Sequence, residues 1–181
     1  MTTPVRYSWP TRLLHWIRAG LILGLTALGW TMTTLPDGTS AEFEWMYPVH
    51  KEFGVLAFLV GVTAIVCRLR SCVPGNPAAL AQWEVLLSIW VQRAMQGLAI
   101  VVPLMGYAMS SSFAQSDGVP FFVGHLPELL PKNDAAFAVF ARLHATLAYL
   151  LLTLIAAHVL GVLKHCFLDR TPGTDVLHRI L

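Results

Sequence analysis

Four long apolar segments dominate the sequence, at residues 13–34, 49–69, 85–113 and 139–167. Each is long enough to cross the hydrocarbon core of a bilayer, which takes about 20 residues in helical form. Only 12% of the residues are charged, whereas a soluble domain usually carries about 25%. The sequence therefore predicts an all-α integral membrane protein, a four-helix bundle with one membrane domain over residues 1–181.

The first apolar segment is interrupted by Arg18, and no small-residue cleavage site follows it. A secretory signal peptide has an unbroken apolar stretch and such a site. We therefore expect this segment to remain in the membrane as a helix. The sequence has no basic stripe of the kind that binds nucleic acid, so the expected partner is the lipid bilayer and no nucleic acid.

The basic residues are distributed unequally between the ends of the four segments. Three lie at one side, namely Lys51, Lys132 and Arg142. Nine lie at the other, namely Arg6, Arg12, Arg18, Arg68, Arg70, Arg93, Lys164, Arg170 and Arg179. Because lysine and arginine are enriched in cytoplasmic loops, we expect both termini to be cytoplasmic.

Four of the seven histidines lie inside the apolar segments: His15, His50, His144 and His158. A strongly polar side chain at membrane depth is costly and indicates a function. His144 and His158 are 14 residues apart, which makes about 3.9 helical turns and roughly 21 Å along the axis. We therefore expect both rings on one stripe of the fourth helix, at two depths.

Each ring of the fourth segment has a counterpart at the same depth. His50 is level with His144, and His15 is level with His158. Two such pairs suit two stacked, six-coordinate haems b, in which ligation on both faces favours electron transfer over oxygen chemistry. Nearby basic residues would balance haem propionates: Lys51 and Arg142 at the first pair, Arg12 and Lys164 at the second. We expect a macrocycle or another helix to approach closely at Gly24, Gly54 and Gly161.

Other interpretations of these histidines remain open. A single intramembrane histidine is equally well explained by a hydrogen bond to a neighbouring helix. A metal transporter would need acidic partners inside the bundle. His165, at the inner edge, suits a quinone headgroup, a propionate or a plain interfacial position. His125 and His178 are expected in solvent.

Four motifs follow one another along the chain: Arg12-Leu13-Leu14-His15-Trp16, Val49-His50-Lys51 before Gly54, Pro103-Leu104-Met105-Gly106-Tyr107, and His144 to His158 with His165. This ordered set resembles the bacterial cytochrome b561 family over nearly the whole chain. The resemblance implies two haems b in a bacterial inner membrane. His15 and His158 would ligate the cytoplasmic-side haem, and His50 and His144 the periplasmic-side one.

The resemblance also implies a reaction. Members of the family exchange electrons with ubiquinone, and one type is a superoxide oxidase that passes the electron of superoxide to quinone. His165 matches a position associated with quinone. The chain departs from the pattern at Gln92, where many relatives have histidine, and at Lys164, which replaces the first of a frequent His-His pair.

The expected outer face carries three basic and seven acidic residues. An anion such as superoxide is steered by positive potential, so this net charge opposes its approach unless Lys51 and Arg142 dominate locally. Three functions follow as hypotheses. The first is a quinone-linked oxidoreductase with superoxide as a possible donor. The second is a haem-carrying membrane anchor that exchanges electrons with a partner dehydrogenase. The third is a haem-free transporter or scaffold.

Overall fold

The computed structural model describes residues 6–36, 42–71, 74–75, 79–116, 118–169, 174 and 176–181. Four long helices account for most of this part: α1 (Trp9–Thr34), α2 (Tyr47–Arg70), α3 (Gln82–Ser112) and α4 (Asp134–Leu163). Within the described residues, these four helices are long and apolar enough to cross a membrane. The predicted set of four spanning helices is confirmed.

Each helix begins where its sequence favours a helical start. Proline stands in the first turn of α1 and of α2, where its missing N–H costs no intrahelical bond. The Glu84 carboxylate accepts a bond from the Ala81 N–H ahead of α3. The Asn133 side chain accepts a bond from the Ala136 N–H and caps α4.

The helices are joined and extended by short elements. Two π-helical turns, η1 (Glu42–Met46) and η2 (Lys164–Leu168), precede α2 and follow α4, and a 3-10 turn, η3 (Leu177–Arg179), lies near the C-terminus. Strands β1 (Val119–Phe121) and β2 (Gly124–Leu126) form an antiparallel hairpin between α3 and α4.

The surface of the helices is apolar, and small residues are frequent among their buried positions, beside the larger Met32 and Leu151. Large side chains such as Leu23, Leu150 and Leu160 are exposed, as expected for helices that face lipid. Among the described residues, Ala57, Ala99 and Ala108 are buried. Small side chains let helices in membranes approach closely, so this bundle is held by close backbone packing.

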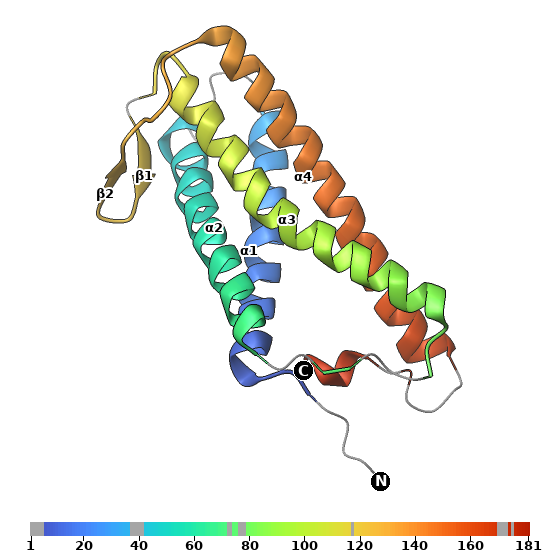
Figure 1. The fold of residues 1–181 in the computed structure, drawn as a ribbon. Coiled ribbons are helices and arrows are strands. Elements are labelled where there is room, and N and C mark those ends of the chain that lie inside the picture. The colour runs from blue at the N-terminus through green and yellow to red at the C-terminus, as the bar shows by residue number, and fades with distance from the viewer. Residues whose placement is uncertain are drawn as a thin grey trace.

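Figure 1 shows that α1 packs on α2, α2 on α3 and α3 on α4. The α1–α2 and α3–α4 pairs meet at the end that carries the hairpin, here called the hairpin end. They diverge toward the opposite end, here called the terminal end, where the two chain termini lie. There the C-terminal segment returns to α1, since the Tyr7 N–H donates to the Arg179 carbonyl at 3.0 Å and Trp16 Nε1 donates to the Ile180 carbonyl at 3.2 Å.

The segment between α3 and α4 is tied to the end of α3 by polar contacts. Ser111 Oγ, fully buried, accepts a bond from the Leu130 N–H at 2.9 Å, and the Asn133 N–H donates to the Ser112 carbonyl at 3.0 Å. Tyr107 donates its hydroxyl proton to the Pro127 carbonyl. These bonds fix the base of the hairpin.

Candidate functional site

Two of the intramembrane histidines face each other near the hairpin end. His50 lies in the first turn of α2, and His144 lies ten residues into α4. Their ring centroids are 6.2 Å apart and the ring planes are nearly perpendicular, at 84°. The structure therefore brings together two histidines that are 94 residues apart in the sequence.

The position of His144 is set by the backbone of α3. Its Nδ1 lies 2.9 Å from the Val102 carbonyl oxygen, and because a carbonyl only accepts, Nδ1 donates and Nε2 keeps its lone pair. The ring can approach this turn because Gly106 has no side chain, and a Cβ there would lie 3.0 Å from His144 Cε1. Such an outer hydrogen bond orients a metal-ligating histidine and fixes its tautomer.

His50 rests against α1 in a similar way. A Cβ added to Gly29 would lie 3.1 Å from His50 Cε1. His50 Nδ1 is buried and makes no hydrogen bond to any described residue. A buried ring nitrogen without a partner carries a free-energy penalty, which a ligand would relieve.

The His50–His144 pair fits a metal held between two imidazoles. An imidazole nitrogen binds a transition metal such as zinc at about 2.0–2.1 Å, so two rings that share one metal ion have centroids roughly 6 Å apart. The observed 6.2 Å agrees with this value. The donor set also suits haem iron, which takes neutral histidine as an axial ligand.

The other two histidines approach each other toward the terminal end. His15 of α1 and His158 of α4 are partly buried and close enough to interact electrostatically. Because α4 is unbroken from Asp134 to Leu163, His144 and His158 lie on one continuous helix, at depths that differ by roughly 21 Å.

Arg18 is a further residue of this site, which the sequence indicated only as a break in the apolar segment and as one of the nine basic residues at that side. Its charge acts on His15, His158 and Arg68, all of them basic groups. Within the described part of the chain it has no carboxylate partner. A charged group inside a span without an opposite charge is costly, so the site favours an anionic ligand group beside it.

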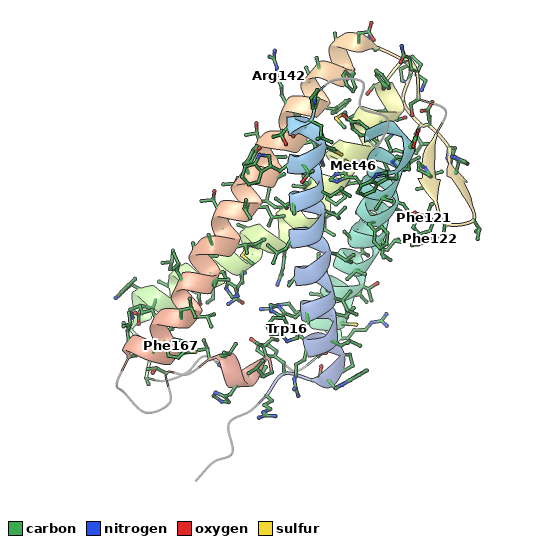
Figure 2. All side chains as sticks on the ribbon, turned by 180° about the vertical axis from the view of Figure 1, so that it is seen from behind. Trp16, Met46, Phe121, Phe122, Arg142 and Phe167 are labelled. Atoms are coloured by element: carbon green, nitrogen blue, oxygen red, sulfur yellow. The ribbon has the colours of Figure 1, made fainter. Side chains whose placement is uncertain are left out.

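The four cations expected near propionates lie in different surroundings. Arg12 has a buried Nε with no described hydrogen-bond partner and lines a pocket of about 190 Å³ with Trp16 and Ile180. Lys51 adjoins His50 and is partly buried. Arg142 is exposed, and Figure 2 shows it on the outside of the bundle.

Lys164, the fourth cation, belongs to a polar cluster at the terminal end. Its ammonium donates to Glu84 Oε1 at 2.6 Å and to Asp169 Oδ1 at 3.1 Å. His165 Nδ1 donates to Asp169 Oδ2 at 2.6 Å. The hydrogen bonds from His165 and Lys164 hold the pKa of Asp169 below its usual value.

Glu84, His165 and Asp169 are also close enough to hold a metal ion together. The Lys164 ammonium already bridges the two carboxylates and offsets part of their charge, which argues against a second cation at this place. Lys164 and His165 belong to the π-helical turn η2, a local widening of the helix that is frequent at functional sites. Spacing along the sequence gave no signal for the Glu84 contact, because that residue comes from α3.

For the glycines, the sequence left two neighbours open, a macrocycle or another helix. No described residue lies within 4 Å of a Cβ built on Gly24, Gly54 or Gly161, so the close approach of another helix is not seen there and that of a macrocycle stays a prediction. The close approaches are at Gly29 and Gly106, against the two imidazoles, and at Gly61, which faces Ile100 and the Ala99 carbonyl. The space beside Gly24 is an open pocket of about 310 Å³ between α1 and α2.

Comparison with known proteins gives two matches. The family described as prokaryotic cytochrome b561 matches residues 6–175. The chain is also similar to cytochrome b561 homolog 2 of Escherichia coli strain K12, with 29% identity over 99% of this chain and 93% of the relative.

Proposed function

The chain belongs to the prokaryotic cytochrome b561 family, and we propose on this premise that it binds two haems b and passes electrons between a donor and ubiquinone. The family indicates a membrane b-type cytochrome that transfers electrons, and the four apolar helices indicate an inner-membrane protein. The observation that carries the haem proposal is the His50–His144 pair, whose 6.2 Å separation suits one iron between two rings; the second haem rests on His15 and His158, which lie close enough to interact electrostatically.

Each haem would have its own pair of ligands in this proposal. His50 and His144 would hold one near the hairpin end, and His15 and His158 the other near the terminal end. Bound haem supplies a one-electron couple, and histidine on both faces leaves no open position for oxygen. The protein contributes the spacing of the two pairs along α4.

The propionates would be held by basic residues near each pair. Arg18 and Arg12 are suitable at the terminal end, because Arg18 pairs with no carboxylate of the described residues and Arg12 has a buried Nε without a described acceptor. Lys51 and Arg142 flank the pair at the hairpin end. Charge-assisted hydrogen bonds of this kind are about twice as strong as neutral ones.

Quinone would react near the terminal end, beside His165. This side chain is only 13% exposed and donates to Asp169. Reduction of a quinone to a quinol takes up two protons as well as two electrons. The Asp169 hydrogen bond would keep a proton on His165 Nδ1 and orient the ring, so that Nε2 would pass protons to the quinone oxygens one at a time. Both protons would come from the cytoplasm, which this site, the Lys164 cluster and both termini would face.

The identity of the donor is the second part of the proposal. Superoxide is one candidate, because the resemblance noted from the sequence includes a superoxide oxidase. The excess of acidic residues on the opposite face favours a positively charged redox protein instead. The chain would then act as a haem-carrying subunit for a partner dehydrogenase, without turnover of its own.

Haem analysis of the purified protein tests the ligand assignment. We expect two haems per chain, and one each after His15→Ala, His50→Ala, His144→Ala or His158→Ala. His125→Ala is the matched control, because that histidine is exposed on β2, and it should keep both haems. Full haem content in all four ligand variants would contradict the assignment.

A kinetic experiment separates the two donor hypotheses. Oxidised protein is mixed with a superoxide pulse and ubiquinone, and haem absorbance and quinol are followed together. Rapid haem reduction followed by quinol formation supports superoxide as the donor. Haems that stay oxidised under superoxide but are reduced by a partner protein support the electron-transfer subunit.

A further inference from the structure

The hairpin between α3 and α4 carries an apolar tip that stays largely exposed. Phe122 is 58% exposed and Val123 is fully exposed. Phe122 has a φ of 44°, a left-handed conformation that is unfavourable for a bulky residue. A strained turn that presents two apolar side chains needs a favourable environment for them.

The tip does not extend away from the helices into solvent. The Phe122 N–H donates to a carboxylate oxygen of Glu52, and the Phe122 ring lies 6.1 Å from that of Phe53, both on α2. Figure 2 shows Phe121 and Phe122 farther along α2 than Met46, which precedes its first turn. The hairpin therefore folds back along the outside of α2.

The depth of the tip follows from its partner. Phe53 is four residues beyond Val49, where the second apolar segment begins, or about 6 Å at 1.5 Å per residue. Interfacial elements bury their apolar face about 5–10 Å into the boundary of headgroups and acyl chains. Lys51 and Glu52, in the same turn as the contact, are charged residues suited to that boundary.

We propose that the β1–β2 hairpin inserts its Phe122–Val123 tip into the lipid interface beside α2. The occupant of this surface is phospholipid, because the tip is continuous with the lipid-facing side chains of the spanning helices. Phe122 and Val123 together expose on the order of 300 Å², well below the roughly 800 Å² per partner of a stable protein interface. A two-stranded hairpin also has backbone N–H and C=O groups along its outer edges that need polar partners. It can therefore lie in the membrane interface but not in the hydrocarbon core.

The contact with Glu52 gives this insertion a structural role. Glu52 is two residues from His50 on the same helix, and the tip amide is the donor that satisfies its carboxylate. A carboxylate near the membrane interior is stabilised by such a bond. The inserted hairpin thus holds the first turns of α2, and with them His50, at a fixed depth.

Spin labels at single cysteines test the position of the tip in bilayers of phospholipid. Cys67, Cys72 and Cys166 are replaced by serine, and Val123→Cys is compared with two references. Leu150→Cys, exposed at the middle of α4, marks the lipid level, and Gln115→Cys, exposed after α3, marks water. Collisions with oxygen and with a water-soluble nickel complex are measured for each.

We expect the label at position 123 to collide with oxygen more than with nickel, as at position 150. Nickel collisions equal to those at position 115 would place the tip in water and overturn the proposal. Low collisions with both reagents would mean that a second copy or another protein covers the tip, which also overturns it. If the cysteine-free protein does not fold, the native chain is labelled instead with a photoreactive diazirine dissolved in the lipid. We then expect the peptide that contains Val123 to be labelled as heavily as the peptides of α4.

Discussion

Gly106 and Gly97 lie on the same helix, yet only Gly106 faces an imidazole. Gly106→Ala would place a methyl group 3.0 Å from His144 Cε1, so the ring or α3 must shift. Overpacking of this kind costs about 1–3 kcal/mol. We expect weaker haem retention and an altered spectrum and midpoint potential for one haem of the two.

Gly97→Ala is the matched control for this prediction, because nothing lies within 4 Å of its Cβ. It should leave the spectrum and both potentials unchanged. The measurement is a redox titration followed in the α-band region. Equal behaviour of the two variants would show that Gly106 has no part in positioning His144.

Arg18 offers a second prediction at the level of single residues. Arg18→Gln removes a positive charge beside His15 and His158, which should favour the oxidised, more positive state of a haem there. Coulomb's law with an effective dielectric constant of about 20 gives roughly 2 kcal/mol for two unit charges about 8 Å apart. We expect the potential of one haem to fall by tens of millivolts.

Arg70→Gln controls for loss of a positive charge at the same end, since that side chain is exposed at the end of α2. Water and salt screen exposed charges, so its effect should be small. If Arg18→Gln left both potentials where they were, the proposed propionate contact would be wrong.

Individual residues were predictable from the sequence to different degrees. The four histidines stand out because polar rings are rare in apolar segments, and the structure brings His50 and His144 together. Gly29 and Arg18 gave no such signal. Their roles depend on which helix faces which, and hydropathy along one chain does not contain that information.

At the level of elements, the π-helical turn η2 places charged and polar side chains close together. It brings His165 and Lys164 onto the Asp169 carboxylate, whose pKa is held below its usual 3.8 by these two contacts. A lowered pKa means that the deprotonated carboxylate stabilises the fold above about pH 4. This contribution is lost as the pH falls through the lowered value.

Asp169→Asn should therefore lower the melting temperature at pH 7, with the difference from the parent protein shrinking below pH 4. Glu44→Gln, at an exposed carboxylate, is the control and should change little at either pH. Thermal unfolding in detergent, followed by haem absorbance, measures both. A difference that stayed constant from pH 7 to pH 3 would contradict the titration of Asp169.

The helices were predicted by hydropathy, but the hairpin and both π-helical turns were not. Strands of three residues are too short for an alternating pattern to be recognised. In the sequence, Phe122 and Val123 look like any other short apolar run, so nothing marks them as the tip of a hairpin. Its conformation depends on Glu52, which is 70 residues away in the sequence.

For the whole molecule, the distribution of charge predicts that both termini face the cytoplasm. Labelling in sealed cells with a membrane-impermeant maleimide tests this orientation, with the native cysteines replaced. A cysteine at Gln115 should react from outside, and one at Leu181 should react only after the membrane is opened. The reverse pattern would invert the proposed direction of electron flow.

The contact of the C-terminal segment with α1 has a consequence for resistance to proteolysis. Along most of their length α1 and α4 are not packed on each other, although His15 and His158 come from these two helices. The backbone bond from Tyr7 to Arg179 and the bond from Trp16 to Ile180 tie α1 to the C-terminal segment instead. We expect a protease that removes these last residues to leave the packing of α1 on α2, α2 on α3 and α3 on α4 in place but to loosen the terminal end, so that haem would be lost there before the helices unfold.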